Sequence, residues 1–256
     1  YAPLEREVSE LMKPRRYSAA TPVGKYLIGF SDHWTAFDDA RLAGRVKLKL
    51  SPPFASTEWQ QHLRLRGQDY LAEAFRRVGL APESRIALYV LGWMGPNGLF
   101  DDPNLYPILF DESLDAMADA CPALPIFVKP HPAMHVHERE ALFERLRRRG
   151  RGLIVASDLH PMVLGQRACF AISNCYSTTF SMLRAMDVPT IEYTAYKARI
   201  LEATAGGSLR PEFVTHFVQR DPAALRRVLC TLSTRPGAVR TDTTKRSVSE
   251  PLLALL

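Results

Sequence analysis

The sequence predicts an α/β fold in which helices cover both faces of a parallel β-sheet. Short apolar runs alternate with helix-like segments in the later part of the chain; the runs are residues 86–91, 125–129, 153–156, 169–173 and 189–192. Uniformly apolar strands are typical of a parallel sheet whose two faces are both covered. We therefore expect residues 85–235 to form a Rossmann-type domain, in which ligands bind beyond the carboxyl ends of the strands.

The helices expected between these strands follow from apolar spacing and from residues that favour helix ends. They are residues 111–120, 137–149, 160–166, 178–186 and 222–232. The last of them has the clearest start, because Asp221 suits the N-cap and Pro222 suits the first helical position.

The first 84 residues follow a different pattern, and we expect them to form a smaller or incomplete N-terminal α/β part. A strand is expected over residues 25–30, and a helix from Thr57, its N-cap, to about Val78, where Gly79 ends it. Residues 81–84 read as a linker. Residues 236–256 are expected to be a C-terminal tail, because the stretch up to Ser249 is rich in Thr, Ser and Arg.

Composition places the chain among globular proteins, and its basic residues have two possible interpretations. It has 256 residues, a net charge of +6 and no apolar run long enough to span a bilayer. The densest basic run contains Arg145, Arg147, Arg148, Arg149 and Arg151. We interpret it as a solvated helix face, with attraction to anionic ligands or an acidic membrane as the alternative. No nucleic-acid-binding motif is present, so no nucleic-acid partner is expected.

The cysteines and the first residues of the chain indicate the cellular compartment in which the protein is expected. The four cysteines form no CxxC pair, and residues 1–16 are charged and lack an apolar signal core. We expect reduced cysteines in a cytoplasmic protein, with peripheral contact to the inner face of the plasma membrane as the alternative that the basic surface suggests. Because the chain does not begin with Met, we expect it to be a fragment or a trimmed form.

The run Phe127-Val128-Lys129-Pro130-His131-Pro132 is the first candidate for a functional site. Its apolar residues end abruptly in a cation, an imidazole and two prolines, which bar a continued strand and an immediate helix. His131 is thereby held at the carboxyl edge of the sheet. There it can donate a hydrogen bond to a phosphate oxygen, and Lys129 can supply positive charge. The alternative is a histidine that only caps a loop.

A second candidate follows the run that ends at Ser173. Asn174, Cys175 and Tyr176 lead into Ser177, Thr178 and Thr179, just before a helix-like segment. Hydroxyl groups together with the unpaired N–H groups of a first helical turn can bind an anion. Helix capping needs only one such hydroxyl, so three in succession favour a phosphate-binding role.

These motifs together resemble the C-terminal half of a GT-B glycosyltransferase. The resemblance rests on Lys-Pro-His-Pro after one strand, Ser-x-x-Tyr-Ser-Thr-Thr after a later one and Val-Pro-Thr-Ile-Glu-Tyr after the next helix, and it covers residues 85–235. It is strongest to bacterial surface-polysaccharide enzymes, namely the CDP-glycerol glycerophosphotransferases and the His-Pro-motif transferases that use CMP-sialic acid or CMP-Kdo.

The resemblance implies roles for individual residues. His131 would contact the donor phosphate together with Lys129, and Ser177, Thr178 and Thr179 would bind the same phosphate. Glu192, at the end of the next strand, would face the donor ribose, unless it is a surface residue of an edge strand. Ser173, Asn174 and Trp93 would lie along the nucleotide. His160, in a second His-Pro pair, would border the base or cap the helix that follows.

The acceptor side departs from the families it resembles. Their catalytic base usually comes from the N-terminal half, but the acidic pair followed by Gly of sialyltransferases and the Gln-Pro motif of Kdo transferases are both absent. Asp32 and His33 are the best local substitutes for deprotonating an acceptor hydroxyl. The 84 residues before the sheet domain are also fewer than a full N-terminal half needs, so we expect that half to be incomplete or much reduced.

Other chemistries have less support. The prolines beside His131 argue against a zinc site with His135 and His137, and we expect no metal. The glycine-rich stretch 92–98 is not a Walker loop, Asp101-Asp102 is better explained as a solvated pair, and Ser177 lacks the Gly-x-Ser-x-Gly elbow of hydrolases.

The sequence thus predicts a metal-independent transferase without a cofactor. It would move a sugar or polyol phosphate from a cytidine-nucleotide donor to a glycan or lipid-linked acceptor at the bacterial surface. The alternatives are a nucleotide-sugar epimerase of GT-B fold and a non-catalytic GT-B-like binding or scaffold subunit.

Overall fold

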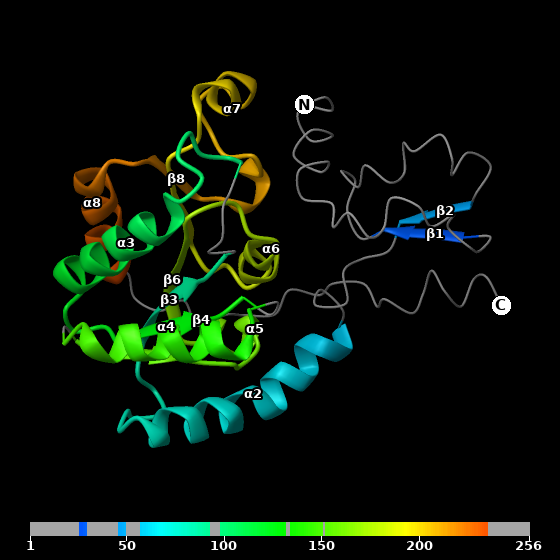
Figure 1. Cartoon of the computed structure of the whole chain (residues 1–256). Helices are drawn as coiled ribbons and strands as arrows, with labels where there is room; N and C mark the ends of the chain where they lie inside the picture. The colour runs from blue at the N-terminus through cyan, green and yellow to red at the C-terminus, as the bar shows by residue number, and fades with distance from the viewer. Residues whose placement is uncertain are drawn as a thin grey trace. The chain divides into compact units, whose positions relative to one another are not determined.

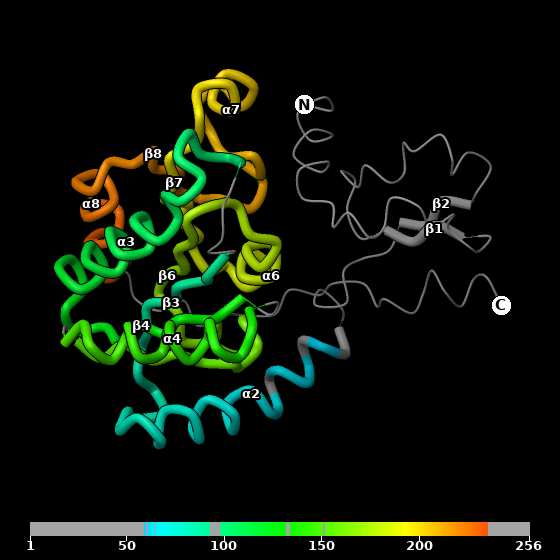
Figure 2. Tube along the Cα trace, viewed as in Figure 1, coloured from blue at the N-terminus to red at the C-terminus, as the bar shows by residue number. Residues whose placement is uncertain are grey.

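The computed structural model describes residues 26–29, 46–49, 57–92, 98–131, 134–150 and 152–234; Figure 2 traces most of them in colour. The chain divides into two compact units, Tyr1–His62 with Asp242–Leu256, and Leu63–Thr241. Asp32, His33 and Trp93, the Pro132 of the His-Pro motif, and the expected tail after residue 235 lie outside the described residues.

The described part of the smaller unit contains a pair of parallel strands. Strand β1 (Tyr26–Gly29) pairs with β2 (Val46–Lys49), with Tyr26 opposite Val46. The strand β1 agrees with the expected strand over residues 25–30, whereas β2 was not predicted. Helix α2 (Thr57–Arg77) follows, and from Leu63 onward it belongs to the larger unit.

A six-stranded, fully parallel sheet forms the centre of the larger unit and confirms the predicted fold class. Its strands are β3 (Ile86–Val90), β4 (Ile126–Lys129), β5 (Ile154–Ala156), β6 (Ala168–Ser173), β7 (Thr190–Thr194) and β8 (His216–Gln219). The strand β8 was not predicted. It is a short edge strand in which only Val218 is fully buried, so it lacks the continuous apolar run of the inner strands.

The order of the strands determines where the chain changes direction. The order is β5-β4-β3-β6-β7-β8, so the chain runs outward from β3 to β5 and then crosses over to β6. This is the doubly wound order in which the direction of winding reverses between the first and fourth strands of the sheet. Here that reversal lies between β3 and β6.

The helices that connect the strands are α3 (Tyr106–Ala120), α4 (Val136–Arg148), α5 (Pro161–Gly165), α6 (Thr179–Arg184), α7 (Ala198–Ala203) and α8 (Pro222–Ser233), with a 3-10 turn at Pro211–Phe213. In Figure 1, α3 and α8 lie on one side of β3 and β6, and α6 lies on the other. Asp221 caps α8 as expected, since its carboxylate accepts hydrogen bonds from the N–H groups of Ala223 and Ala224, both at 2.9 Å. The turn at residues 211–213 and α7 were not predicted, and α3 begins five residues before the predicted start at 111.

Aromatic side chains fill the core on both faces of the sheet. All five residues of β3 are buried, which explains its uniformly apolar sequence. Tyr89 of β3 packs edge-on against Phe110 of α3, with ring centroids 5.0 Å apart. Phe75 of α2 packs on Phe127 of β4 at 5.4 Å. This contact packs the later part of α2 against the sheet, whereas the sequence pattern predicts a domain boundary after the helix.

Candidate functional site

The carboxyl ends of β4, β3 and β6 lie side by side at one edge of the sheet. Val90 of β3 is opposite Lys129 of β4, and Tyr89 is opposite Ile172 of β6. The turn at Lys129–His131 and the segment 174–179 therefore leave the sheet at the same edge, on either side of β3. Parallel sheets of this order bind ligands at the point where the winding reverses, which makes this edge the candidate site.

Gly92 lies two residues after the end of β3. Its N–H donates a hydrogen bond of 2.6 Å to the hydroxyl oxygen of Tyr106, which is wholly buried at the start of α3. A Cβ atom on Gly92 would lie 2.8 Å from that oxygen and 3.2 Å from two ring carbons. Only glycine therefore allows the backbone to approach α3 this closely at the edge of the candidate site.

Gly92→Ala is expected to lower the free energy of unfolding by about 1–3 kcal/mol, because the added methyl group overpacks against Tyr106. Urea unfolding measures this loss. Tyr106→Phe removes the nearest atom, so the Gly92→Ala change should be less damaging in the Tyr106→Phe background. Equal losses in both backgrounds would contradict the assignment of the clash to the Tyr106 hydroxyl.

Lys129, His131 and His160 form a basic group of one lysine and two histidines that follows the ends of β4 and β5. Lys129 is half-buried, and burial lowers its pKa; the charge of Arg139 acts in the same direction, and Asp158 opposes it. Burial also lowers the pKa of His131 and of His160, and in each case the charge of Lys129 lowers it further. Both imidazoles are therefore neutral near pH 7, and each ring carries one N–H group.

His160 also caps helix α5. Its Nδ1 accepts a hydrogen bond of 3.3 Å from the N–H of Met162, so the proton of the neutral ring is on Nε2. Of the two roles expected for His160, capping is therefore realised. Close by, Arg139 of α4 pairs with Asp158 at 3.1 Å. The position of Arg139 could not be predicted from the sequence, because only the packing of α4 brings it close to Lys129 and Asp158.

The three hydroxyl residues after β6, Ser177, Thr178 and Thr179, differ in the contacts they make. The hydroxyl oxygen of Ser177 accepts a hydrogen bond of 3.3 Å from the N–H of Thr179, the first residue of α6. Thr178 is exposed, and its side chain makes no capping hydrogen bond. One of the three hydroxyls thus serves the helix start. The phosphate-binding role expected for this segment stays a prediction.

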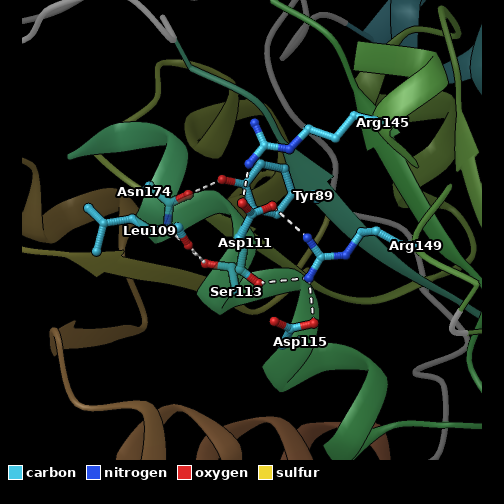
Figure 3. Close-up of polar contacts among 8 residues, drawn as sticks. All are labelled: Tyr89, Leu109, Asp111, Ser113, Asp115, Arg145, Arg149 and Asn174. Carbon is cyan, nitrogen blue, oxygen red and sulfur yellow. Dashed lines mark hydrogen bonds and ion pairs between the residues drawn. The ribbon is translucent and has the colours of Figure 1, made fainter. Parts of the chain in front are cut away.

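Asn174 was predicted to contact the nucleotide, but its side chain is wholly buried and occupied by protein groups (Figure 3). Its Oδ1 accepts a hydrogen bond from the Tyr89 hydroxyl. Its Nδ2 donates to Ser113 Oγ at 2.8 Å and to the carbonyl oxygens of Tyr193 and Leu109 at 2.9 and 3.2 Å. The amide therefore joins the end of β6 to β3, α3 and β7. Ser173, predicted beside it along the nucleotide, is also wholly buried.

Glu192 was expected at a strand end, with a surface position on an edge strand as the alternative. It lies in the middle of β7, an interior strand, and is wholly buried. Its two carboxylate oxygens accept hydrogen bonds from the hydroxyls of Tyr196 and Ser208. Burial raises the pKa of Glu192 to about 6, although these two hydrogen bonds and the backbone of Tyr176 act to lower it.

The raised pKa of Glu192 makes part of the stability depend on pH. The folded state holds the proton more tightly than the unfolded state, whose glutamate titrates near 4.5. The ionisation of Glu192 therefore lowers the free energy of unfolding as the pH rises from 4.5 through about 6. Glu192→Gln lacks this dependence, because glutamine does not ionise. Relative to wild type, the free energy of unfolding of Glu192→Gln should increase by about 2 kcal/mol between acidic and neutral pH. Urea titrations across this range measure the difference; a constant difference would contradict the raised pKa.

The arginine run on α4 is largely occupied by acidic partners. Arg145 and Arg149 both pair with Asp111 of α3, and Arg149 also pairs with Asp115 (Figure 3). Arg147 and Arg148 pair with Glu144 of their own helix. Arg151 lies outside the described residues. These pairs favour the solvated-face interpretation over a membrane-binding patch.

Three further observations concern metal ions, membranes and the cysteines. In the described part of the chain, no group of three or more His, Cys, Asp or Glu side chains is arranged to hold a metal ion. Among the helices that the structure describes, none has the length and apolar character needed to cross a bilayer. All four cysteines are unpaired.

Comparison with known proteins defines the class of fold. The architecture is that of the GT-B-like α/β proteins, as its similarity to one solved structure shows. That structure is Methanocaldococcus jannaschii UDP-GlcNAc 2-epimerase in complex with UDP-GlcNAc and UDP, with a TM-score of 0.55 and 13% sequence identity. The match covers 91% of this chain and 60% of the epimerase, so the chain spans less than two thirds of that enzyme. No protein-family model matches the chain, and no curated protein matches it.

Proposed function

We propose that this chain belongs to a GT-B-type transferase and binds its nucleotide-activated donor at the carboxyl edge of the sheet. The donor would be a cytidine nucleotide that carries a sugar or a polyol phosphate. The acceptor would be a glycan or lipid-linked glycan of the bacterial surface. The single observation that carries the proposal is the strand order, because it brings the Lys129–His131 turn and the Ser177–Thr179 segment to either side of β3.

The chemistry of these two segments suits a leaving phosphate. Transfer from a nucleotide donor builds negative charge on the phosphate that departs with the nucleotide. A neutral His131 N–H, the Lys129 ammonium group and the hydroxyls of Ser177, Thr178 and Thr179 would stabilise that charge. Because burial already lowers the pKa of His131, the ring acts here as a hydrogen-bond donor rather than as a second cation. These groups supply the stabilisation without a metal ion or a cofactor.

The remaining roles extend from this phosphate site. His160, which is fixed by its cap on α5, would border the base through Nε2, and Trp93 would cover the nucleotide from the loop after β3. Asp32 and His33 remain our candidates for the base that deprotonates the acceptor hydroxyl. The acceptor side would be formed by the part of residues 1–84 that precedes Leu63, because the residues from Leu63 onward belong to the unit that contains the sheet. Residues 85–235 would form the donor side, and residues 236–256 the tail.

A second candidate is a nucleotide-sugar epimerase, which the similarity in fold to UDP-GlcNAc 2-epimerase favours. The two activities differ in what they require. An epimerase converts the donor when no acceptor is present, whereas a transferase needs an acceptor. Product analysis with donor alone, by chromatography of the nucleotide sugars, separates them.

His131→Ala is expected to lower turnover by about 10²–10³-fold, the usual effect of removing one donor from a site that stabilises developing charge. Steady-state transfer assays measure this loss, and the unfolding midpoint checks that the fold survives. His137→Ala is a matched control, because His137 is an exposed histidine on the neighbouring helix α4. Wild-type turnover in His131→Ala would refute the assignment.

Thermal stabilisation by added nucleotides tests which nucleotide the protein binds. CMP or CDP is expected to raise the thermal midpoint by about 5 °C at about 100-fold above its Kd, since a ligand that binds only the folded state stabilises it. UDP and GDP should give smaller shifts. A larger shift with UDP would instead favour the epimerase, and no shift with any of the four would contradict the proposed donor site.

A further inference from the structure

A chain of buried and partly buried hydrogen bonds leads away from the predicted phosphate-binding segment. The backbone N–H of Tyr176, the residue before Ser177, donates a hydrogen bond of 3.1 Å to the hydroxyl oxygen of Tyr196. The Tyr196 hydroxyl in turn donates to Oε1 of Glu192. Because Glu192 accepts the only proton of that hydroxyl, the Tyr196 oxygen is left as the acceptor for Tyr176.

The other carboxylate oxygen of Glu192 is fixed from the opposite direction. The Ser208 hydroxyl donates to Oε2, and the Ser208 oxygen accepts a hydrogen bond of 3.0 Å from the N–H of Arg210. Thr204 holds the same segment after α7, since its hydroxyl lies 2.8 Å from the carbonyl oxygen of Gly207 and 2.9 Å from that of Ile200. Glu192 therefore links the segment after β6 to an ordered segment after α7.

Tyr196 itself has little freedom to move. Its N–H donates to Oε1 of Gln219 at 3.2 Å, and its carbonyl oxygen accepts from Nε2 of the same side chain at 2.8 Å. Its ring stacks with the rings of Phe100 and Phe217, whose centroids are 6.4 and 6.1 Å away. The position of its hydroxyl is therefore set by β8 and by the ring contacts, and Tyr176 must adapt to it.

The segment after β6 is held at alternate residues. Asn174 is fixed by its buried amide, and Tyr176 is fixed by its N–H. Cys175 lies between them, and Ser177 follows directly. The two anchors determine the direction in which the chain enters Ser177–Thr179.

We propose that Glu192 is a positioning residue that, through the Tyr196 hydroxyl, holds the segment Tyr176–Thr179 in the conformation that binds the donor phosphate. The inference rests on the donor-phosphate site proposed above. It assigns Glu192 an indirect role, in place of the direct ribose contact that the sequence resemblance implied. It also gives a function to a carboxyl group that would otherwise be an unexplained polar group in the core.

Three substitutions test this role. Tyr196→Phe removes the central hydroxyl but keeps the stacked ring. Glu192→Leu removes the acceptor, and Glu192→Gln keeps a carbonyl oxygen that can accept from Tyr196. Tyr193→Phe is the matched control, because it also removes a buried tyrosine hydroxyl on or near β7, but one that donates to Glu112 at 2.7 Å instead.

The first measurement is the Kd for CMP and CDP by calorimetry, together with KM and kcat where turnover is found. Tyr196→Phe and Glu192→Leu should weaken nucleotide binding by about tenfold, the usual effect of losing one buried hydrogen bond that orders a binding segment. The change should fall on Kd and KM more than on kcat. Glu192→Gln should recover most of the affinity, and Tyr193→Phe should bind as wild type even if it is less stable.

The second measurement is hydrogen exchange of the backbone amides at residues 176–180, which needs no ligand. Tyr196→Phe should accelerate exchange there by about tenfold relative to Tyr193→Phe. Unchanged exchange in this segment would overturn the positioning role, whatever the wild type binds. If Tyr196→Phe exchanges faster but the wild type binds none of CMP, CDP, UDP and GDP, the positioning role is supported and the proposed function is refuted. Faster exchange with unaltered nucleotide affinity would overturn the inference that positioning serves binding.

Discussion

The buried amide of Asn174 is the contact on which the arrangement of the candidate site depends. It lies directly after β6, where the direction of winding reverses, and it contacts β3 through Tyr89, α3 through Ser113 and β7 through the carbonyl of Tyr193. A buried amide without partners would be strongly unfavourable, so the four elements must keep the geometry that satisfies it. That geometry sets the point from which the chain leaves the sheet toward Ser177–Thr179.

Burial then decides the charge of the groups at the sheet edge. Lys129, His131 and His160 share one region, and burial lowers the pKa of all three, so the two imidazoles are neutral and one cation remains among them. Glu192 shows the opposite response to the same cause, because burial of an acid raises its pKa. The site therefore combines one positive charge with neutral donors, an arrangement that suits a phosphate that gains charge during a reaction.

Local chemistry in the sequence indicated much of this architecture. The apolar runs of β3, β4 and β6 and the cap of Asp221 on α8 were predicted because each depends on neighbouring residues alone. The edge strand β8 was not, because its half-exposed residues lack an apolar run. The position of Glu192 inside β7 and the buried contacts of Asn174 were not predicted from the sequence either. Glu192 is followed by Tyr193 and Thr194, which continue β7 into the core, and the partners of Asn174 lie 19, 61, 65 and 85 residues away.

The amino-acid sequence by itself determined the α/β class, the ends of β4 and β6, and the presence of Lys129, His131 and the hydroxyl residues 177–179 at or just after those ends. These follow from side-chain polarity and from the backbone restrictions of proline, which act over a few residues. Only the tertiary structure decided the strand order, the buried roles of Asn174 and Glu192, and the link from Glu192 through Tyr196 to Tyr176. Hydrogen bonds and desolvation between distant segments fix these features, and both exist only after the chain has packed.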